Sequence, residues 1–183
     1  MIQEAKLRKE IMIPDSVHLS LDNGLTVKGP KGEIKKVINE PSVKMELQGN
    51  KLVLSPSKLN KNQKRIINTC KSHINNMIHG VQEPFEYKLK VCSSHFPMSV
   101  AVDGHNFVVK NFLGEKVPRK STILPNTKVT VQGDTVTVTG PDIEAVSQTA
   151  ANIEQSTRIT NRDRRVFQDG VWIISKAGQE IAR

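Results

Sequence analysis

Two segments of the chain alternate hydrophobic and polar residues with a period of two, and a short polar turn interrupts each of them. The alternation surrounds Gly49 in residues 43–56 and Gly133 in residues 127–141. Such alternation on both sides of a turn predicts an antiparallel hairpin with one buried face. The apolar face of each hairpin then needs another element to cover it.

A segment of helical character follows each hairpin and can provide that cover. In the first, an apolar stripe that includes Ile66 and Ile78 recurs at steps of three and four residues, and lysines lie on the other faces. We expect Asn60 to cap the start of this helix and Gly80 to close its end. The second helix is shorter, with Asp142 as its expected cap.

The two halves of the chain repeat the same order of elements. Residues 17–36 correspond to residues 98–120, and residues 43–56 correspond to residues 127–141. A repeat of this length indicates duplication of a small domain. The predicted fold class is α+β, with two tandem duplicated domains, each of small antiparallel β-sheets with one α-helix around a single core. The predicted domains are residues 1–81 and 82–183.

The charge of the chain indicates a polyanionic partner. Its 183 residues include 27 lysines and arginines against 18 acidic residues, a net charge of +9. No apolar run approaches the length of a membrane span, and the first residues lack the apolar stretch of a secretory signal, so we expect a cytoplasmic protein without membrane contact. Composition does not separate RNA from DNA, but with only seven aromatic residues, recognition of the phosphates and shape of a folded nucleic acid is favoured over base stacking.

Neither an enzyme nor a metal site is expected. Cys70 and His73 form one CxxH pair and Cys92 and His95 another, but Cys70 falls on the apolar helix stripe and the pairs lie in different repeats, so convergence on one zinc ion is disfavoured. The sequence has no GxSxG, HExxH or GxxxxGK[ST] motif. We therefore expect no catalytic residues, no cofactor and no small-molecule substrate.

Basic residues concentrate at two places in the second repeat. One is the loop at 110–120, where Gly114 allows close backbone approach to a ligand. The other is the segment 158–165, which contains four of the eight arginines of the chain. Because a guanidinium group binds phosphate through paired hydrogen bonds, these two places are candidate contact surfaces.

Several motifs together resemble the large-subunit ribosomal protein L-six family, in its archaeal and eukaryotic branch. They are GPKGE at 29–33, NFLGEK at 111–116, and a closing signature that comprises Gln155, Ile159, Arg162, Arg165, Phe167, Asp169-Gly170-Val171, Ile173 and Lys176. Trp172 stands where the family usually has tyrosine. The similarity runs over essentially the whole chain.

This resemblance implies two similar domains and a structural, non-catalytic role in the large ribosomal subunit of the cytoplasm. The implied partners are large-subunit (23S-type) rRNA near the stalk base and the factor-binding region, and neighbouring large-subunit proteins. The second domain would be the main rRNA-binding domain. The implied contact residues are Lys110, Asn111, Leu113, Gly114, Lys116, Arg119, Lys120, Arg162, Arg164, Arg165 and Lys176.

We further expect Asp169-Gly170 to turn a basic hairpin near the C-terminus. Val166-Phe167 and residues 171–173 would form its anchored strands, and the preceding arginines would reach RNA phosphates.

Two other functions are compatible with the basic composition. A free-standing protein-interaction module would bind through the duplicated β-surface, and its binding would survive moderate salt and nuclease. A nucleic-acid-processing enzyme would need paired carboxylates and a metal ion, for which the sequence has no pattern.

Overall fold

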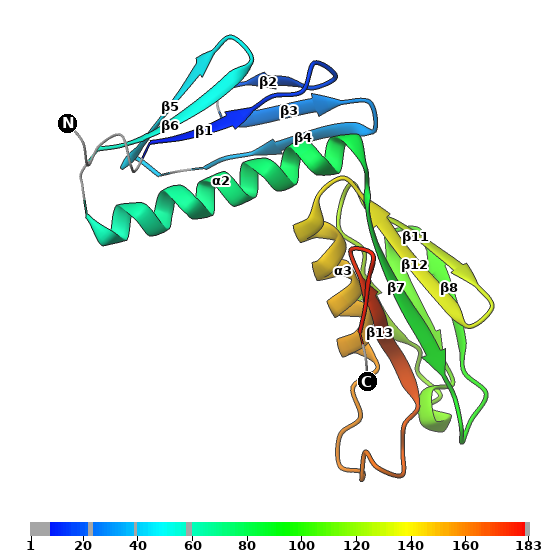
Figure 1. The fold of residues 1–183 in the computed structure, drawn as a ribbon. Coiled ribbons are helices and arrows are strands. Elements are labelled where there is room, and N and C mark those ends of the chain that lie inside the picture. Colours follow the sequence, from blue (N-terminus) through cyan, green and yellow to red (C-terminus); the bar gives the residue numbers. More distant parts are fainter. Residues whose placement is uncertain (1–7, 22–23, 39, 58–59, 182–183) are drawn as a thin grey trace. The chain divides into compact units, whose positions relative to one another are not determined.

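The computed structural model describes residues 8–21, 24–38, 40–57 and 60–181. The chain divides into two compact units, residues 1–84 and 85–183 (Figure 1). Within these described ranges, both units combine antiparallel sheets with one long helix, so the α+β class predicted from the sequence is confirmed.

The first unit contains two three-stranded antiparallel sheets and helix α2. The strand orders are β1-β6-β5 and β2-β3-β4. The elements are β1 (Lys9–Met12), β2 (His18–Ser20), β3 (Leu25–Gly29), β4 (Gly32–Lys36), β5 (Val43–Gln48), β6 (Lys51–Pro56) and α2 (Lys61–Gln82). The apolar stripe of α2 packs on both sheets, and Leu52 and Ile74 are completely buried in this core.

The expected N-cap of α2 is confirmed, whereas its expected end is wrong. The Asn60 side chain accepts a hydrogen bond of 2.8 Å from the N–H of Gln63. At the other end, Gly80 is buried inside the helix, which continues to Gln82. The additional turn places Val81 in the core with no exposed surface, so burial of that side chain favours continuing the helix beyond the glycine.

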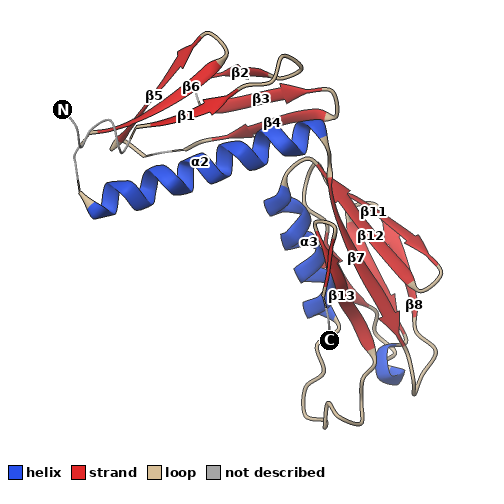
Figure 2. Cartoon of the chain, viewed as in Figure 1, coloured by secondary structure: helices blue, strands red, loops and turns tan. Residues whose placement is uncertain are grey.

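The described part of the second unit, residues 85–181, likewise combines two antiparallel sheets with a helix. The strand orders are β10-β9-β8 and β11-β12-β7-β13-β14. The elements are β7 (Phe85–Cys92), β8 (Ser99–Asp103), β9 (Asn106–Lys110), the 3₁₀ turn η1 (Phe112–Gly114), β10 (Arg119–Thr122), β11 (Lys128–Gln132), β12 (Thr135–Gly140), α3 (Ile143–Ser156), β13 (Gly170–Lys176) and β14 (Gln179–Glu180). Helix α3 lies on the five-stranded sheet (Figure 2).

Strand β13 distinguishes the second unit from the first. After α3 the chain passes through the loop 158–169 and returns as β13, which pairs with β7 from Gly170↔Cys92 to Lys176↔Tyr87. The hairpin predicted at Asp169-Gly170 is therefore wrong. The real turn is at Ala177-Gly178, between β13 and β14, and residues 166–167 form no strand because β7 already supplies the partner of β13.

Asp142 provides a test of how strongly α3 is held at its start. Its side chain accepts a hydrogen bond of 3.0 Å from the N–H of Glu144, so Asp142→Ala should lower the free energy of unfolding of this unit by about 1 kcal/mol. Asp142→Asn keeps the acceptor and should change it much less. Urea unfolding followed by the fluorescence of the single tryptophan, Trp172, measures both variants. Equal losses would contradict the capping role.

Candidate nucleic-acid interface

The first candidate surface is the loop between β9 and β10. Phe112 is completely enclosed at 1 % exposure, and Leu113 packs against the same core. Asn111 and Leu113 adopt positive φ angles of 58° and 48°, a conformation that costs free energy for side chains other than glycine. The anchoring of Phe112 holds this strained backbone, and Asn111 adds a hydrogen bond of 2.9 Å to the carbonyl of Pro97. These contacts hold the turn in one conformation, in which Gly114 and Lys116 are exposed.

Arg119 clamps this loop to the end of α3. Its Nη1 donates to the carbonyls of Ser156 at 3.0 Å and Arg158 at 3.1 Å, and its Nε and Nη2 donate to the carboxylate of Glu115. The guanidinium also lies 4.2 Å from the centroid of the Phe112 ring. The hydrogen bond from Arg119 lowers the pKa of Glu115 below its ordinary value. Since its donors are engaged within the protein, Arg119 positions both basic segments, which differs from the direct RNA contact implied by the resemblance.

The second candidate surface is the arginine loop, which we define as residues 158–169. Its two ends lie close together because the buried hydroxyl of Thr157 accepts a hydrogen bond of 3.0 Å from the N–H of Val171. Arg162, Arg164 and Arg165 are all exposed on it. A loop of this length with joined ends is typical of the compact surface loops that carry function.

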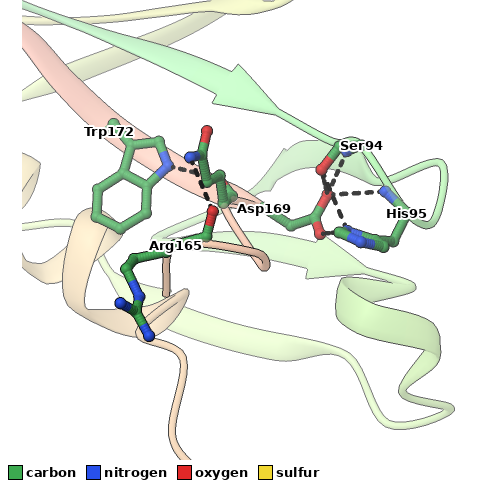
Figure 3. A network of polar contacts seen from close by, with 6 residues as sticks. Ser94, His95, Arg165, Asp169 and Trp172 are labelled. Atoms are coloured by element: carbon green, nitrogen blue, oxygen red, sulfur yellow. Dashed lines mark hydrogen bonds and ion pairs between the residues drawn. The ribbon is translucent and has the colours of Figure 1, made fainter. Parts of the chain in front are cut away.

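Asp169 fixes the far end of the arginine loop. The residue is 2 % exposed. Its carboxylate accepts hydrogen bonds from the backbone N–H of Ser94, the N–H of His95 at 3.2 Å, the Ser94 hydroxyl at 3.2 Å and Nδ1 of His95 at 2.8 Å (Figure 3). Burial alone would raise the pKa of Asp169, but these donors outweigh it and the pKa lies below its ordinary value. This anchor also explains why Asp169 is no hairpin turn residue.

Ser94, His95 and Asp169 have the composition of a hydrolase triad but not its geometry. In a triad the acid and the nucleophile bind opposite nitrogens of the histidine ring. Here the Ser94 hydroxyl, at 3.2 Å, and the Asp169 carboxylate, at 2.8 Å, both face Nδ1. The histidine therefore cannot relay a proton from the serine, and the cluster is an anchor for the loop.

Aromatic rings and guanidinium groups alternate around the arginine loop. The His95 and Phe167 rings are stacked, with centroids 4.6 Å apart. The Arg162 guanidinium lies 4.8 Å from the centre of the Phe167 ring. Arg164 lies 6.0 Å from the Trp172 ring. Sequence reasoning missed the roles of these rings, although Phe167 and Trp172 stand within the arginine-rich signature, where alternation of aromatic and basic residues was the available signal.

Arg165 is oriented by a neighbouring acid. Its Nε and Nη2 donate to the Asp163 carboxylate, with Nη2 at 2.7 Å from Oδ2. Hydrogen bonding between the two side chains lowers the pKa of Asp163 and raises that of Arg165. Asp163 also accepts the backbone N–H of Arg165 at 2.9 Å, so one carboxylate sets both the turn and the direction of the arginine.

The structure brings most of the implied contact residues into these two loops, but not Lys176. Lys110, Lys116 and Lys120 are exposed in or beside the β9–β10 loop, which Arg119 ties to the start of the arginine loop. Lys176 lies at the other end of β13 from Gly170, a separation of roughly 20 Å for an extended strand. It belongs to a different part of the surface.

Comparison with known proteins assigns the chain to a family. The family model "Ribosomal protein L6" matches residues 13–84 and 96–170. The chain belongs to the ribosomal protein L6 family. It is 46% identical over 177 residues to "Large ribosomal subunit protein uL6" of Methanobrevibacter smithii, covering 96% of this chain and 99% of that protein.

Two further archaeal relatives carry the same name. The protein of Natronomonas pharaonis is 45% identical, with 91% of this chain and 95% of the relative covered. That of Haloarcula marismortui is 46% identical, with coverage of 92% and 96%. The resemblance to the archaeal and eukaryotic branch is thereby confirmed, and a member of this family of ribosomal proteins is a structural protein rather than an enzyme.

Among the described residues, no three His, Cys, Asp or Glu side chains are grouped so that they could hold a metal ion. None of the helices in the described ranges is long and apolar enough to cross a membrane.

Replacement of Asp169 tests the anchor of the arginine loop. Asp169→Asn removes a charged acceptor from buried donors and should lower the free energy of unfolding by about 1–3 kcal/mol at pH 7. Because the folded-state pKa of Asp169 is lowered, its charged form stabilises the fold above the unfolded pKa of about 3.9. The difference in the free energy of unfolding between wild type and Asp169→Asn should therefore become smaller as the pH falls below that value.

Urea titrations at several pH values, read by Trp172 fluorescence, measure this narrowing. Asp163→Asn is the matched control, because Asp163 is an exposed acid of the same loop, and it should change the free energy of unfolding much less than Asp169→Asn at neutral pH. A pH-independent difference between wild type and Asp169→Asn would contradict the anchoring role of the charge.

Replacement of Arg119 tests the clamp. Arg119→Lys keeps the charge but cannot reach Glu115 and both helix-end carbonyls at once, so we expect a loss of about 1–2 kcal/mol in the free energy of unfolding. Lys116→Ala, at an exposed position of the same loop, should have little effect. Thermal unfolding compares the two variants, and equal stability of Arg119→Lys and wild type would contradict the clamp.

Proposed function

We propose that the chain is a structural component of the large ribosomal subunit and binds large-subunit rRNA through the arginine loop and the β9–β10 loop. The observation that carries this proposal is the anchored loop itself, which presents Arg162, Arg164 and Arg165 to solvent from a base fixed by buried Asp169. Its relatives named as large ribosomal subunit proteins support the assignment to that particle.

The arrangement suits phosphate recognition on folded RNA. Guanidinium groups bind phosphate oxygens through paired donors, and a fixed loop keeps those donors at a defined spacing. The exposed lysines of the neighbouring loop, Lys110, Lys116 and Lys120, extend the positive surface. At Asn111, Leu113 and Gly114 the contacts would come from the strained turn, whose backbone can approach the sugar-phosphate chain closely.

We assign different parts of the rRNA contact to the two repeats. The second repeat, residues 82–183, is the main rRNA-binding domain, and the first, residues 1–81, contributes a more diffuse lysine-rich surface. Lys176, at the far end of β13, would make a separate contact. The proposed position in the cytoplasmic ribosome is near the stalk base and the factor-binding region, next to other large-subunit proteins.

A triple variant tests the arginine loop as an RNA contact. The change of Arg162, Arg164 and Arg165 to alanine should weaken binding to purified large-subunit rRNA and reduce the slope of log affinity against log salt by about 2–3, roughly one phosphate contact per lost charge. Filter binding over a series of salt concentrations measures the slope. The variant should also leave the large-subunit peak of a sucrose gradient at lower salt than wild type.

A charge-matched control separates local contact from net charge. The change of Lys61, Lys64 and Arg65 to alanine removes the same charge from exposed positions of α2 and should preserve more of the slope. Equal slopes in the two triple variants would reject the arginine loop as the contact. A wild-type protein that stays at the top of the gradient, or whose binding survives nuclease, would favour the protein-interaction module.

A further inference from the structure

A pocket lies beside the arginine loop, between the loop and the strands β7 and β13. Its volume is about 420 Å³, and it is lined by Cys92, Arg164, Arg165, Phe167, Gln168 and Trp172. This size falls in the range of small-molecule sites. The lining combines two aromatic rings, a carboxamide and two exposed guanidinium groups, and phosphate contact by the arginines alone does not account for a hollow with aromatic walls.

Trp172 is held in one orientation at this pocket. Its Nε1 donates a hydrogen bond of 3.1 Å to the carbonyl of Gln168 (Figure 3). The backbone of Gly170 packs so closely that an added Cβ would lie 3.2 Å from Cε2 of the indole, and its φ of +152° also favours glycine. The indole is thus a preorganised flat surface, which reduces the entropy lost when a ligand stacks on it.

Phe167 has a different part in the pocket. Its ring is already stacked on His95 and covered by the guanidinium of Arg162. It therefore forms a fixed wall of the pocket, and the Trp172 ring is the second aromatic group of the lining. Gln168 holds its own place through a hydrogen bond of 3.3 Å from Nε2 to the carbonyl of Arg165.

The spacing between Trp172 and Arg164 fits a flat ring with a small adjustment. The guanidinium carbon of Arg164 lies 6.0 Å from the centroid of the Trp172 ring, at the outer limit of a cation–π contact. A planar group inserted between them needs about 3.5 Å on each side, or about 7 Å in total. Because the Arg164 side chain is exposed, it can move by the missing distance, so a ring can be enclosed between indole and guanidinium.

The charges around the pocket select a nucleotide over an uncharged aromatic group. Arg164 and Arg165 stand at the pocket, and Arg165 reaches outward from Asp163 with its side chain 90% exposed. An aromatic base stacked on Trp172 would thus have its own phosphate within the arginine cluster. The Gln168 carboxamide offers both donor and acceptor chemistry to a base edge.

We propose that this pocket binds one unpaired base of the rRNA, turned out of its helix and stacked on Trp172. The inference rests on the proposed function and specifies what the arginine loop recognises: an RNA strand with an extruded nucleotide, in addition to helix phosphates. Stacking of bases on aromatic side chains is the usual means by which proteins recognise unpaired RNA.

The test measures the binding of purified large-subunit rRNA by full-length variants. Trp172→Ala should lower the affinity by about 5- to 150-fold, the range given by loss of one stacked base, with an unchanged salt slope because no charge is lost. Trp172→Tyr keeps an aromatic ring and should retain most of the affinity. Addition of rRNA should also quench the fluorescence of Trp172 in the wild-type protein.

Val166→Ala is the matched control, because Val166 is an exposed apolar residue of the same loop that does not line the pocket. It should bind like wild type. If Trp172→Ala fails to fold, the comparison of Trp172→Tyr with Trp172→Leu replaces it, since leucine keeps bulk but offers no flat ring.

The outcomes separate this inference from the proposed function. Wild-type binding that depends on the three arginines, with no quenching of Trp172 and no loss of affinity without an aromatic ring, overturns the base pocket alone. Absence of wild-type rRNA binding overturns the proposed function together with it. Quenching by rRNA together with selective loss in the non-aromatic variants supports the pocket.

Discussion

The buried carboxylate of Asp169 is the constraint on which the candidate interface depends. A buried charge is destabilising unless donors surround it, and here Ser94 and His95 supply backbone and side-chain donors to both oxygens. Those donors come from the loop that follows β7, whereas Asp169 directly precedes β13. One carboxylate therefore closes the arginine loop, fixes the start of β13 and positions the His95 ring against Phe167.

Among the described residues, the arginine loop with its anchor belongs to the second unit, and the connection of the strands explains why. Both units pack a helix against antiparallel sheets, but after α3 the chain returns to pair β13 with β7. The return requires a connection from the end of α3 to the start of the strand, and that connection is the arginine loop. Thr157 and Asp169 hold its two ends, and Arg119 adds the β9–β10 loop to the same framework.

Local patterns in the sequence were sufficient for the elements but not for the site. Alternation and helical spacing predicted the hairpins around Gly49 and Gly133 and the caps at Asn60 and Asp142, because neighbours along the chain determine these features. The anchor pairs Ser94 with Asp169 across 75 positions, a relation that no local pattern contains. For the same reason Asp169-Gly170 was mistaken for a turn, and the hydrogen bonds from Arg119 to the carbonyls of Ser156 and Arg158 were not predicted.

The two acidic residues Asp163 and Glu115 lie among the basic residues of these loops because each of them orients an arginine. The Asp163 carboxylate accepts hydrogen bonds from Nε and Nη2 of Arg165. Nη1 of Arg165 makes no hydrogen bond to any of the described residues. A guanidinium has enough donors to be oriented by a carboxylate and still bind a phosphate, whereas a lysine ammonium lacks this fixed fork. Asp163 therefore reduces the net charge of the loop but gives it direction. Glu115 likewise orients Arg119, whose remaining donors hold the end of α3, so at these two positions arginine has a role that lysine could not fill.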